Sequence, residues 1–312
     1  MTNEVAQPAY QSKLAKVNDL YMPMITRQLE GNDIKMSGYQ KTVVLNAMTA
    51  ISATLKNAGL TLKDVDSSNI TSILLSVAAL ELNAAAEPRE VYFITRRRKD
   101  KASNNYVQTI EMGIEGDGND ALLARFGRGV ETVHKFWAVR EGDGFKYPKH
   151  MGLEMTAPQW NETGEGKVVR VVYPITFEDG TTEYFIGERE DVRKNLIAHV
   201  SQNLMWDKGT AKDDFAKAIE DKTLDQILDD PELVKLGKIS PAWASPQARE
   251  SMIVRKMRNN VVKKIPKDFR NSFVASEYTQ ATDESYKAMR RDVTEQANTE
   301  SFDAIAEQSA PQ

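Results

Sequence analysis

Cysteine is absent from the 312 residues, which excludes disulfides, thiolate zinc sites and cysteine nucleophiles. The three histidines, His134, His150 and His199, are isolated and form no H-E-x-x-H motif, so nothing predicts a histidine-ligated metal. No run of about 18 apolar residues is present, and the polar, acidic N-terminus lacks the apolar segment of a secretory signal. These absences favour a cytoplasmic protein that spans no membrane.

Nucleotide-binding and calcium-binding loops are also missing. Residues 164–167 come nearest to a P-loop, but they lead into a strand and lack the hydroxyl that would hold Mg²⁺. Asp117, Asn119 and Asp120 lack the twelve-residue spacing and terminal glutamate of a calcium loop, so a glycine-rich turn is the better interpretation. The sequence therefore predicts neither nucleotide hydrolysis nor a calcium site.

The net charge of −4 is close to neutral, but the charged residues are unevenly distributed. Between Ser245 and Arg270 there are eight basic residues and two acidic ones. Between Arg89 and Lys101 there are six basic residues and two acidic ones. From Glu277 to Glu307 the balance is reversed, with eight acidic residues and three basic ones. The chain therefore carries two local basic patches and an acidic C-terminal stretch.

Hydrophobic periodicity places strands in the middle of the chain, between two groups of helices. Early helices are expected at Ser12–Leu29, at Lys41–Ala58, and from a cap at Ser68 or Asn69 to before Pro88. Strands are expected at Glu90–Thr95, Tyr106–Met112, Val133–Arg140, Lys167–Ile175 and Thr182–Ile186. Later helices are expected at Ala121–Phe126, Asp191–Met205, Ala211–Leu228 and Pro246–Ile265. This order predicts an α+β fold with antiparallel hairpins packed against helices.

The same reading divides the chain into three segments. Residues 1–38 form a polar, partly helical N-terminal segment, and residues 39–270 form the core, with the long basic helix near its C-terminal end. Residues 271–312 are acidic and poor in large apolar groups, which predicts a mobile tail.

The long basic helix offers a face of fixed positive charge. Arg249, Lys256 and Lys263 lie seven residues apart and share a stripe, with Arg255 and Arg258 beside it, while apolar residues recur on a different face. Two interpretations remain open for this pattern. It is either a solvated basic face balanced by the acidic tail or a phosphate-binding surface.

A second basic cluster favours phosphate binding. Arg96, Arg97, Arg98 and Lys99 fall between the first two expected strands, in what we expect to be a long charged loop, and aromatic residues such as Tyr92 lie nearby in sequence. Cations that follow a backbone, beside aromatic platforms, are what single-stranded nucleic acid requires.

Two other functions are weighed against nucleic-acid binding. Asp143, Glu165 and Lys167 have the acidic-and-lysine composition of metal-dependent nucleases, in which carboxylates hold Mg²⁺. The charge segregation is also compatible with a phage structural or adaptor protein, which would form oligomers that ignore DNA.

Several stretches occur in the order of a known family: Ser72–Asn83, Glu90–Phe93, Val107–Gly116, Leu122–Gly127, Val139–Phe145 and Ile253–Lys256. In these the chain resembles the RecT/Redβ family of phage single-strand annealing proteins, over about residues 40–268. The most specific piece is Val139–Phe145, which is close to the family's V-R-E-G-D-x-F. The family's G-Y-[KR]-G turn is here Gly113-Ile114-Glu115-Gly116, a basic pair is replaced by Glu250-Ser251, and Trp243 only loosely matches the family's tryptophan-containing segment.

The resemblance implies a recombination and repair protein that is not an enzyme, coats single-stranded DNA and anneals it to a complementary strand without ATP. It further implies rings or filaments, a phage 5′→3′ exonuclease and a host single-strand binding protein as partners, and the cytoplasm of a bacterial host. No cofactor is expected to be required, and Mg²⁺ as an aid to DNA binding is left open. DNA contacts are expected from Tyr92, Arg96, Arg97, Arg98, Lys99, Arg125, Arg140, Arg249, Arg255, Lys256, Arg258 and Lys263.

Overall fold

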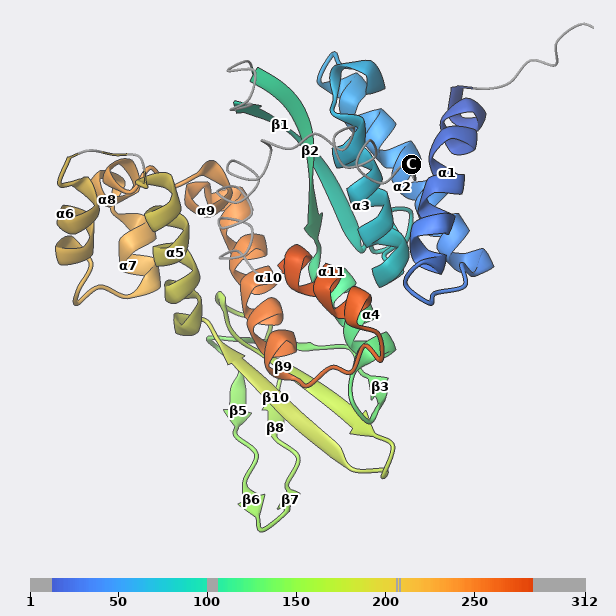
Figure 1. Ribbon diagram of the computed structural model, residues 1–312. Coiled ribbons are helices and arrows are strands. Elements are labelled where there is room, and N and C mark those ends of the chain that lie inside the picture. Colours follow the sequence, from blue (N-terminus) through green and yellow to red (C-terminus); the bar gives the residue numbers. More distant parts are fainter. Residues whose placement is uncertain (1–12, 100–105, 206, 208, 283–312) are drawn as a thin grey trace, which may run out of the picture. The chain divides into compact units, whose positions relative to one another are not determined.

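A computed structural model describes residues 13–99, 106–205, 207 and 209–282 of the protein (Figure 1). Helices and small antiparallel sheets form the described chain, which confirms the α+β class. The described residues fall into two compact units. One contains the residues up to Gly118 together with those from Phe269, and the other contains Asn119–Asp268. The segment 39–270, predicted from the sequence as one core, includes residues of both units.

The first unit consists of helices packed on one hairpin. Its elements are α1 (Lys13–Glu30), α2 (Gly38–Asn57), the short helix η1 (Leu62–Asp64), α3 (Ser67–Leu80), β1 (Val91–Lys99), β2 (Tyr106–Ile114) and α11 (Ser272–Thr282). A capping box starts α2, in which Ser37 and Gln40 satisfy each other's backbone N–H groups. The cap of α3 is Asp66, whose carboxylate accepts a hydrogen bond from the Ser68 N–H, rather than either residue predicted from the sequence.

The core of this unit lies where α2 and α3 contact the inner end of the hairpin. Phe93 of β1 pairs with Met112 of β2, and both are buried together with Val91 and Ile110 on one face of the ribbon. Asn69, one of the predicted caps, instead hydrogen-bonds the backbone N–H and C=O of Ile110. The inner end of the hairpin is thus held both by apolar packing and by a side chain of α3.

Helix α11 lies within the stretch predicted to be a mobile tail. It packs on α3 and buries Val274 and Ala281, and the buried carboxylate of Glu277 accepts a hydrogen bond from the Ser76 hydroxyl. The predicted tail therefore begins too early, because apolar residues of α11 recur at a spacing that places them against α3. Residues 283–312 lie outside the described part of the chain.

The second unit combines a small sheet with a series of helices. Its strands are β3 (Val130–Val133), β4 (Trp137–Arg140), β5 (Gly144–Lys146), β6 (His150–Met151), β7 (Glu154–Met155), β8 (Gln159–Asn161), β9 (Val168–Phe177) and β10 (Thr182–Glu188). Its helices are α4 (Gly116–Phe126, which begins in the first unit), η2 (Glu190–Val192), α5 (Arg193–Asn203), α6 (Ala211–Ala218), α7 (Leu224–Asp229), α8 (Pro231–Leu236), α9 (Pro241–Ala244) and α10 (Pro246–Lys264). No described helix is long and apolar enough to span a membrane.

Strand β9 is the centre of the sheet. It pairs antiparallel with β10 along one edge, and β3 and β4 share its other edge. One face is covered by α10, which approaches closely at Gly187. A Cβ there would lie 2.7 Å from Cγ2 of Val261, so a larger residue would push the helix away. The buried face of β9 and α10 thereby form the core of this unit.

Three elements differ from the sequence prediction. The glycine-rich turn expected before Ala121 belongs to α4, and the strand expected at Val133–Arg140 is split into β3 and β4. The helix expected at Ala211–Leu228 is interrupted before Thr223, whose side chain forms a capping box with Gln226 and starts α7. That Thr-x-x-Gln pattern was visible in the sequence.

Candidate nucleic-acid interface

The basic cluster after Thr95 lies on a strand and not in a loop. Strand β1 continues to Lys99, so that Arg96 and Arg97 pair with Thr109 and Gln108 of β2. Arg98 and Lys99 follow at the strand positions opposite Val107 and Tyr106, and their side chains lie outside the described residues. We call residues 96–99 of β1 and 106–108 of β2 the outer hairpin. Its regular pairing fixes the spacing of the cations, which a loop would not.

The outer hairpin presents a guanidinium beside an aromatic ring. The guanidinium carbon of Arg97 lies 4.7 Å from the ring centroid of Tyr106, and this tyrosine is 60% exposed. Arg96 forms an ion pair with Glu111, with 3.0 Å between Nε and Oε2. Both groups of this pair are solvent-accessible, and an exposed pair contributes only about 0–1 kcal/mol, so a phosphate can compete for Arg96. The arrangement suits a backbone phosphate and an adjacent base.

Tyr92 has a packing role in the same hairpin. It is the cross-strand partner of Gly113, and a Cβ on that glycine would lie only 2.2 Å from Cζ of the tyrosine. The ring therefore lies directly on the glycine backbone, which explains why a glycine is needed there. Nearby, Glu115, where the family turn has a basic residue, forms an ion pair with Arg89 at 3.4 Å.

Two of the predicted DNA contacts on α10, Arg258 and Arg249, form bonds within the second unit. Arg258 is only 9% exposed, and its Nη2 donates a hydrogen bond to Oδ2 of Asp120 at 2.6 Å. Its Nε donates to the hydroxyl of Tyr173, and its guanidinium lies over the ring of Phe136. Burial and the nearby Asp120 carboxylate raise the pKa of Tyr173, which keeps its hydroxyl protonated and able to donate to Asp120. Within this unit Arg258 joins α10, α4 and β9.

Arg249 has a similar structural role at the start of α10. Its guanidinium forms an ion pair with Asp229 and donates to the backbone carbonyls of Leu228 and Ala244. These bonds hold α10 against the ends of α7 and α9. Arg249 and Arg258 remain predictions as DNA contacts, but the geometry shows that each first stabilises the fold.

The remaining predicted cations are more accessible. Arg255 and Lys256 are half-buried on α10, and Lys263 is exposed in its last turn beside Lys264. Lys264, which was not among the predicted contacts, follows Lys263 directly and is also exposed at this helix end. Arg125 is half-buried in the last turn of α4. The last turn of a helix, where the negative end of its dipole lies, is a favourable position for positively charged side chains.

The most family-like stretch, Val139–Phe145, forms a tight turn around Asp143. Its carboxylate accepts hydrogen bonds from the Arg140 N–H, the Thr163 N–H and hydroxyl, and the indole N–H of Trp160. These donors, the Arg140 and Thr163 N–H groups above all, hold the pKa of Asp143 well below its ordinary value. The Arg140 guanidinium donates to the Gly166 carbonyl at 2.8 Å. The motif thus joins two neighbouring loops.

Two of the residues suggested for a nuclease form bonds within the protein. Asp143 already accepts four hydrogen bonds from the protein, and Lys167 forms ion pairs with Asp225 at 3.0 Å and Glu141 at 3.8 Å. Among the described residues no group of three histidines or carboxylates converges as a metal site. Asp143 and Lys167, two of the three residues suggested for Mg²⁺ chemistry, therefore have partners within the protein.

Glu250, which stands where the family has a basic residue, is explained by a buried arginine. Arg189 is 6% exposed and donates to both carboxylate oxygens of Glu250, at 2.9 and 2.6 Å, and to Asp225. A buried guanidinium needs such counter-charges, and removing one would leave it unpaired. The departure from the family pattern at this position thus serves the packing of α10 on β10.

One protein family matches most of the chain. Residues 42–288 match the RecT family, which confirms the resemblance seen in the sequence. No curated protein and no solved structure matches the chain. Members of the matched family bind single-stranded DNA and oligomerise. Since the match covers well over half of its length, the chain belongs to the RecT family, whose members carry out phage-type single-strand annealing recombination.

Proposed function

We propose that the protein binds single-stranded DNA through its accessible cations and anneals complementary strands without ATP. The observation that carries this proposal is the outer hairpin, where Arg97 and the exposed ring of Tyr106 are held together on a strand whose inner end is fixed in the core. Aromatic rings stack on any base and cations follow any backbone, so this combination binds without reading sequence.

The proposed annealing activity depends on which part of the DNA the cations contact. Fixed cations lower the repulsion between two polyanions, and contacts to phosphates leave the base edges free to pair. Base pairing then supplies the driving force, so no nucleotide hydrolysis is needed. Mg²⁺ would act on the same repulsion, and we propose that it aids binding without being required.

The predicted contacts divide into three groups. Arg96, Arg97 and Lys263 have exposed side chains and are the primary contacts, with Arg98 and Lys99 continuing the same strand. Half-buried residues come second, and these are Tyr92, Arg125, Arg140, Arg255 and Lys256. Arg249 and Arg258 act by holding α10 in place and are not proposed as primary contacts.

An annealing protein needs single strands as substrate, which intact DNA does not offer. We therefore propose that a 5′→3′ exonuclease supplies the substrate and that a host single-strand binding protein occupies the same DNA before annealing. The exonuclease would produce, and the single-strand binding protein would coat, the single strands that the outer hairpin would bind.

The test measures annealing and binding with the same labelled oligonucleotides, without ATP and with or without Mg²⁺. Wild-type protein should anneal complementary strands, and its affinity should fall with salt by a slope of about −0.7 per phosphate neutralised. The double variant Arg96→Ala/Arg97→Ala should bind all sequences more weakly. Arg89→Ala is the matched control, since Arg89 is an exposed, ion-paired arginine of the same unit, and this variant should bind as wild type does.

Three outcomes would contradict the proposal. A DNA affinity that does not change with salt concentration would show that binding does not depend on phosphate contacts. Shortened strands in the presence of Mg²⁺ would restore the nuclease interpretation, and oligomers that leave DNA unshifted at low salt would favour an adaptor protein.

A further inference from the structure

Residues 144–161 of the second unit form a narrow β-ribbon, which we call the arm. Its base consists of β5 paired with β8, and its far end consists of β6 paired with β7 (Figure 1). The base is anchored on the sheet by aromatic contacts. Trp160 stacks on Trp137 of β4, with 5.5 Å between ring centroids, and Phe145 lies under the guanidinium of Arg170 at 4.8 Å. The arm is therefore held firmly at its base.

The far end of the arm is apolar and exposed. Met151 is 66% exposed and Leu153 is fully exposed, and between them Gly152 has the positive φ of +69° that the turn requires. We call Met151–Leu153 the tip. Large apolar side chains grouped at the end of an anchored projection are typical of a surface that inserts into a partner. Because Leu153 is fully exposed, the tip is not held by the described residues of its own unit.

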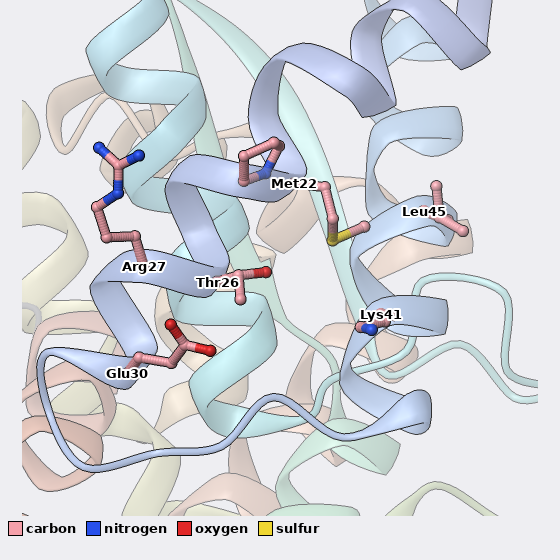
Figure 2. A pocket seen from close by; sticks show the side chains of 7 residues that line it. Met22, Thr26, Arg27, Glu30, Lys41 and Leu45 are labelled. Atoms are coloured by element: carbon pink, nitrogen blue, oxygen red, sulfur yellow. The ribbon is translucent and has the colours of Figure 1, made fainter.

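A matching depression lies on the first unit, between α1 and α2. Met22 and Thr26 of α1 face Leu45 of α2 across a cleft of about 590 Å³, which is lined mainly by apolar atoms (Figure 2). Charged residues complete its lining, with Arg27 and Lys41 contributing positive charge and Glu30 negative charge. We call this depression the cleft. Its mainly apolar lining, with charged residues of both signs, suits an apolar knob with charged neighbours.

We infer that the tip of one copy of this chain inserts into the cleft of another copy. The residues that flank the tip include Lys149 and Glu154, so the charges beside the knob can meet both signs on the rim. A contact between two different surfaces is heterologous, and repeating it closes into a ring or continues as a filament. The inference rests on the proposed function in one respect, because it names the surfaces by which an annealing protein of this family would assemble.

The test uses one variant of each surface. Leu153→Glu places a carboxylate on the tip, and Met22→Glu places one in the cleft. Each should raise the protein concentration needed for assembly by about tenfold or more, because an unpaired carboxylate is costly to bury. Sedimentation velocity of the full chain measures this, with circular dichroism to confirm folding. Met205→Glu is the control, because it alters another exposed apolar residue of the second unit, and Leu45→Ala is a milder cleft variant should Met22→Glu misfold.

Mixing the two variants gives the decisive result. The Leu153→Glu chain keeps its cleft and the Met22→Glu chain keeps its tip, so together they should form one-to-one pairs and nothing longer. An assembly pattern unchanged in both variants would overturn the inference, as would wild-type protein that stays monomeric with and without DNA.

The outcome is separable from that of the proposed function. Annealing by wild-type protein, with unaltered assembly of the variants, would refute the tip and the cleft and leave the annealing activity standing. A tip variant that assembles normally but binds single-stranded DNA poorly would show that the arm contacts DNA, and this too would overturn the inference.

Discussion

The outer hairpin and helix α10 carry similar clusters of positive charge in the sequence, yet they use that charge differently. On the hairpin, the exposed Arg97 lies over the ring of the exposed Tyr106, and Arg96 forms an ion pair with the partly exposed Glu111. On α10, Arg249 and Arg258 are drawn into the fold by Asp229 and by Asp120 with Tyr173. The difference follows from where each element packs. A helix lying on a sheet brings part of its charged surface toward other elements, whereas the outer end of a ribbon projects beyond its core.

The largest effect is expected from breaking the buried cluster on α10. Arg258→Ala leaves Asp120 without its cation and the Tyr173 hydroxyl without a donor, which should lower the free energy of unfolding by about 3–5 kcal/mol. Chemical denaturation followed by circular dichroism measures the change. Arg97→Ala serves as the control and should leave stability nearly unchanged, since its side chain is exposed. Equal stability losses in the two variants would remove the distinction between the two regions.

A smaller loss of stability is expected at the start of α10. Arg249→Ala removes an ion pair and two hydrogen bonds to backbone carbonyls, and the cost should be about 1–3 kcal/mol. The Lys263→Ala variant, on the same helix, should unfold like wild type but bind DNA more weakly. If Arg249→Ala instead kept full stability and lost only DNA affinity, Arg249 would be a DNA contact, as is proposed for the hairpin residues, rather than a residue that stabilises the fold.

On the hairpin the expected loss is in binding rather than in stability. Tyr106→Ala should weaken binding of single-stranded DNA by about 1–3 kcal/mol through lost stacking, while Tyr106→Phe keeps the ring and should bind nearly as wild type does. Arg97→Ala should instead reduce the magnitude of the salt slope by about 0.7, because one phosphate contact to the single strand is lost. Fluorescence anisotropy over a range of salt separates the two effects. A slope that changes equally for Tyr106→Ala would show that the ring acts only by placing Arg97.

These two regions also show how far the sequence could lead. The apolar spacing of α10 and the first part of β1 were readable, because helix and strand periods appear within short windows. The continuation of β1 through Arg96–Lys99 was instead predicted as a loop. The partner of Arg258 could not be predicted, because Asp120 is far away in the chain and comes close to Arg258 only in the folded protein. The same holds for Glu250, whose acidic character made sense only beside the buried Arg189. Charge counts therefore located both basic regions but could not tell binding residues from structural ones.

The smallest effect concerns Lys267, just beyond α10, whose amine donates to the backbone carbonyls of Val262 and Ile265. Burial, and then the nearby Lys263, lower the pKa of Lys267 to about 8 from 10.5. A lysine with a lowered folded pKa loses its proton earlier in the folded state than in the unfolded state, so the unfolded chain binds more protons between these two values. Stability should therefore rise with pH across this window.

The rise is expected to be about 1 kcal/mol between roughly pH 8 and 9.5, since the partial exposure of Lys267 reduces the full value of 1.36 kcal/mol per pKa unit. The window ends there because Tyr173, whose pKa is raised above 10.0, opposes the trend once tyrosines of the unfolded chain ionise. Lys267→Met should flatten the profile, while Lys264→Met, an exposed lysine on the same helix, should keep the wild-type slope. A profile that falls with pH in wild type would mean that the amine is stabilised by its carbonyl partners more than it is penalised by burial. In that case the protonated amine of Lys267 would be stabilised by its partners, as the guanidinium of Arg258 is.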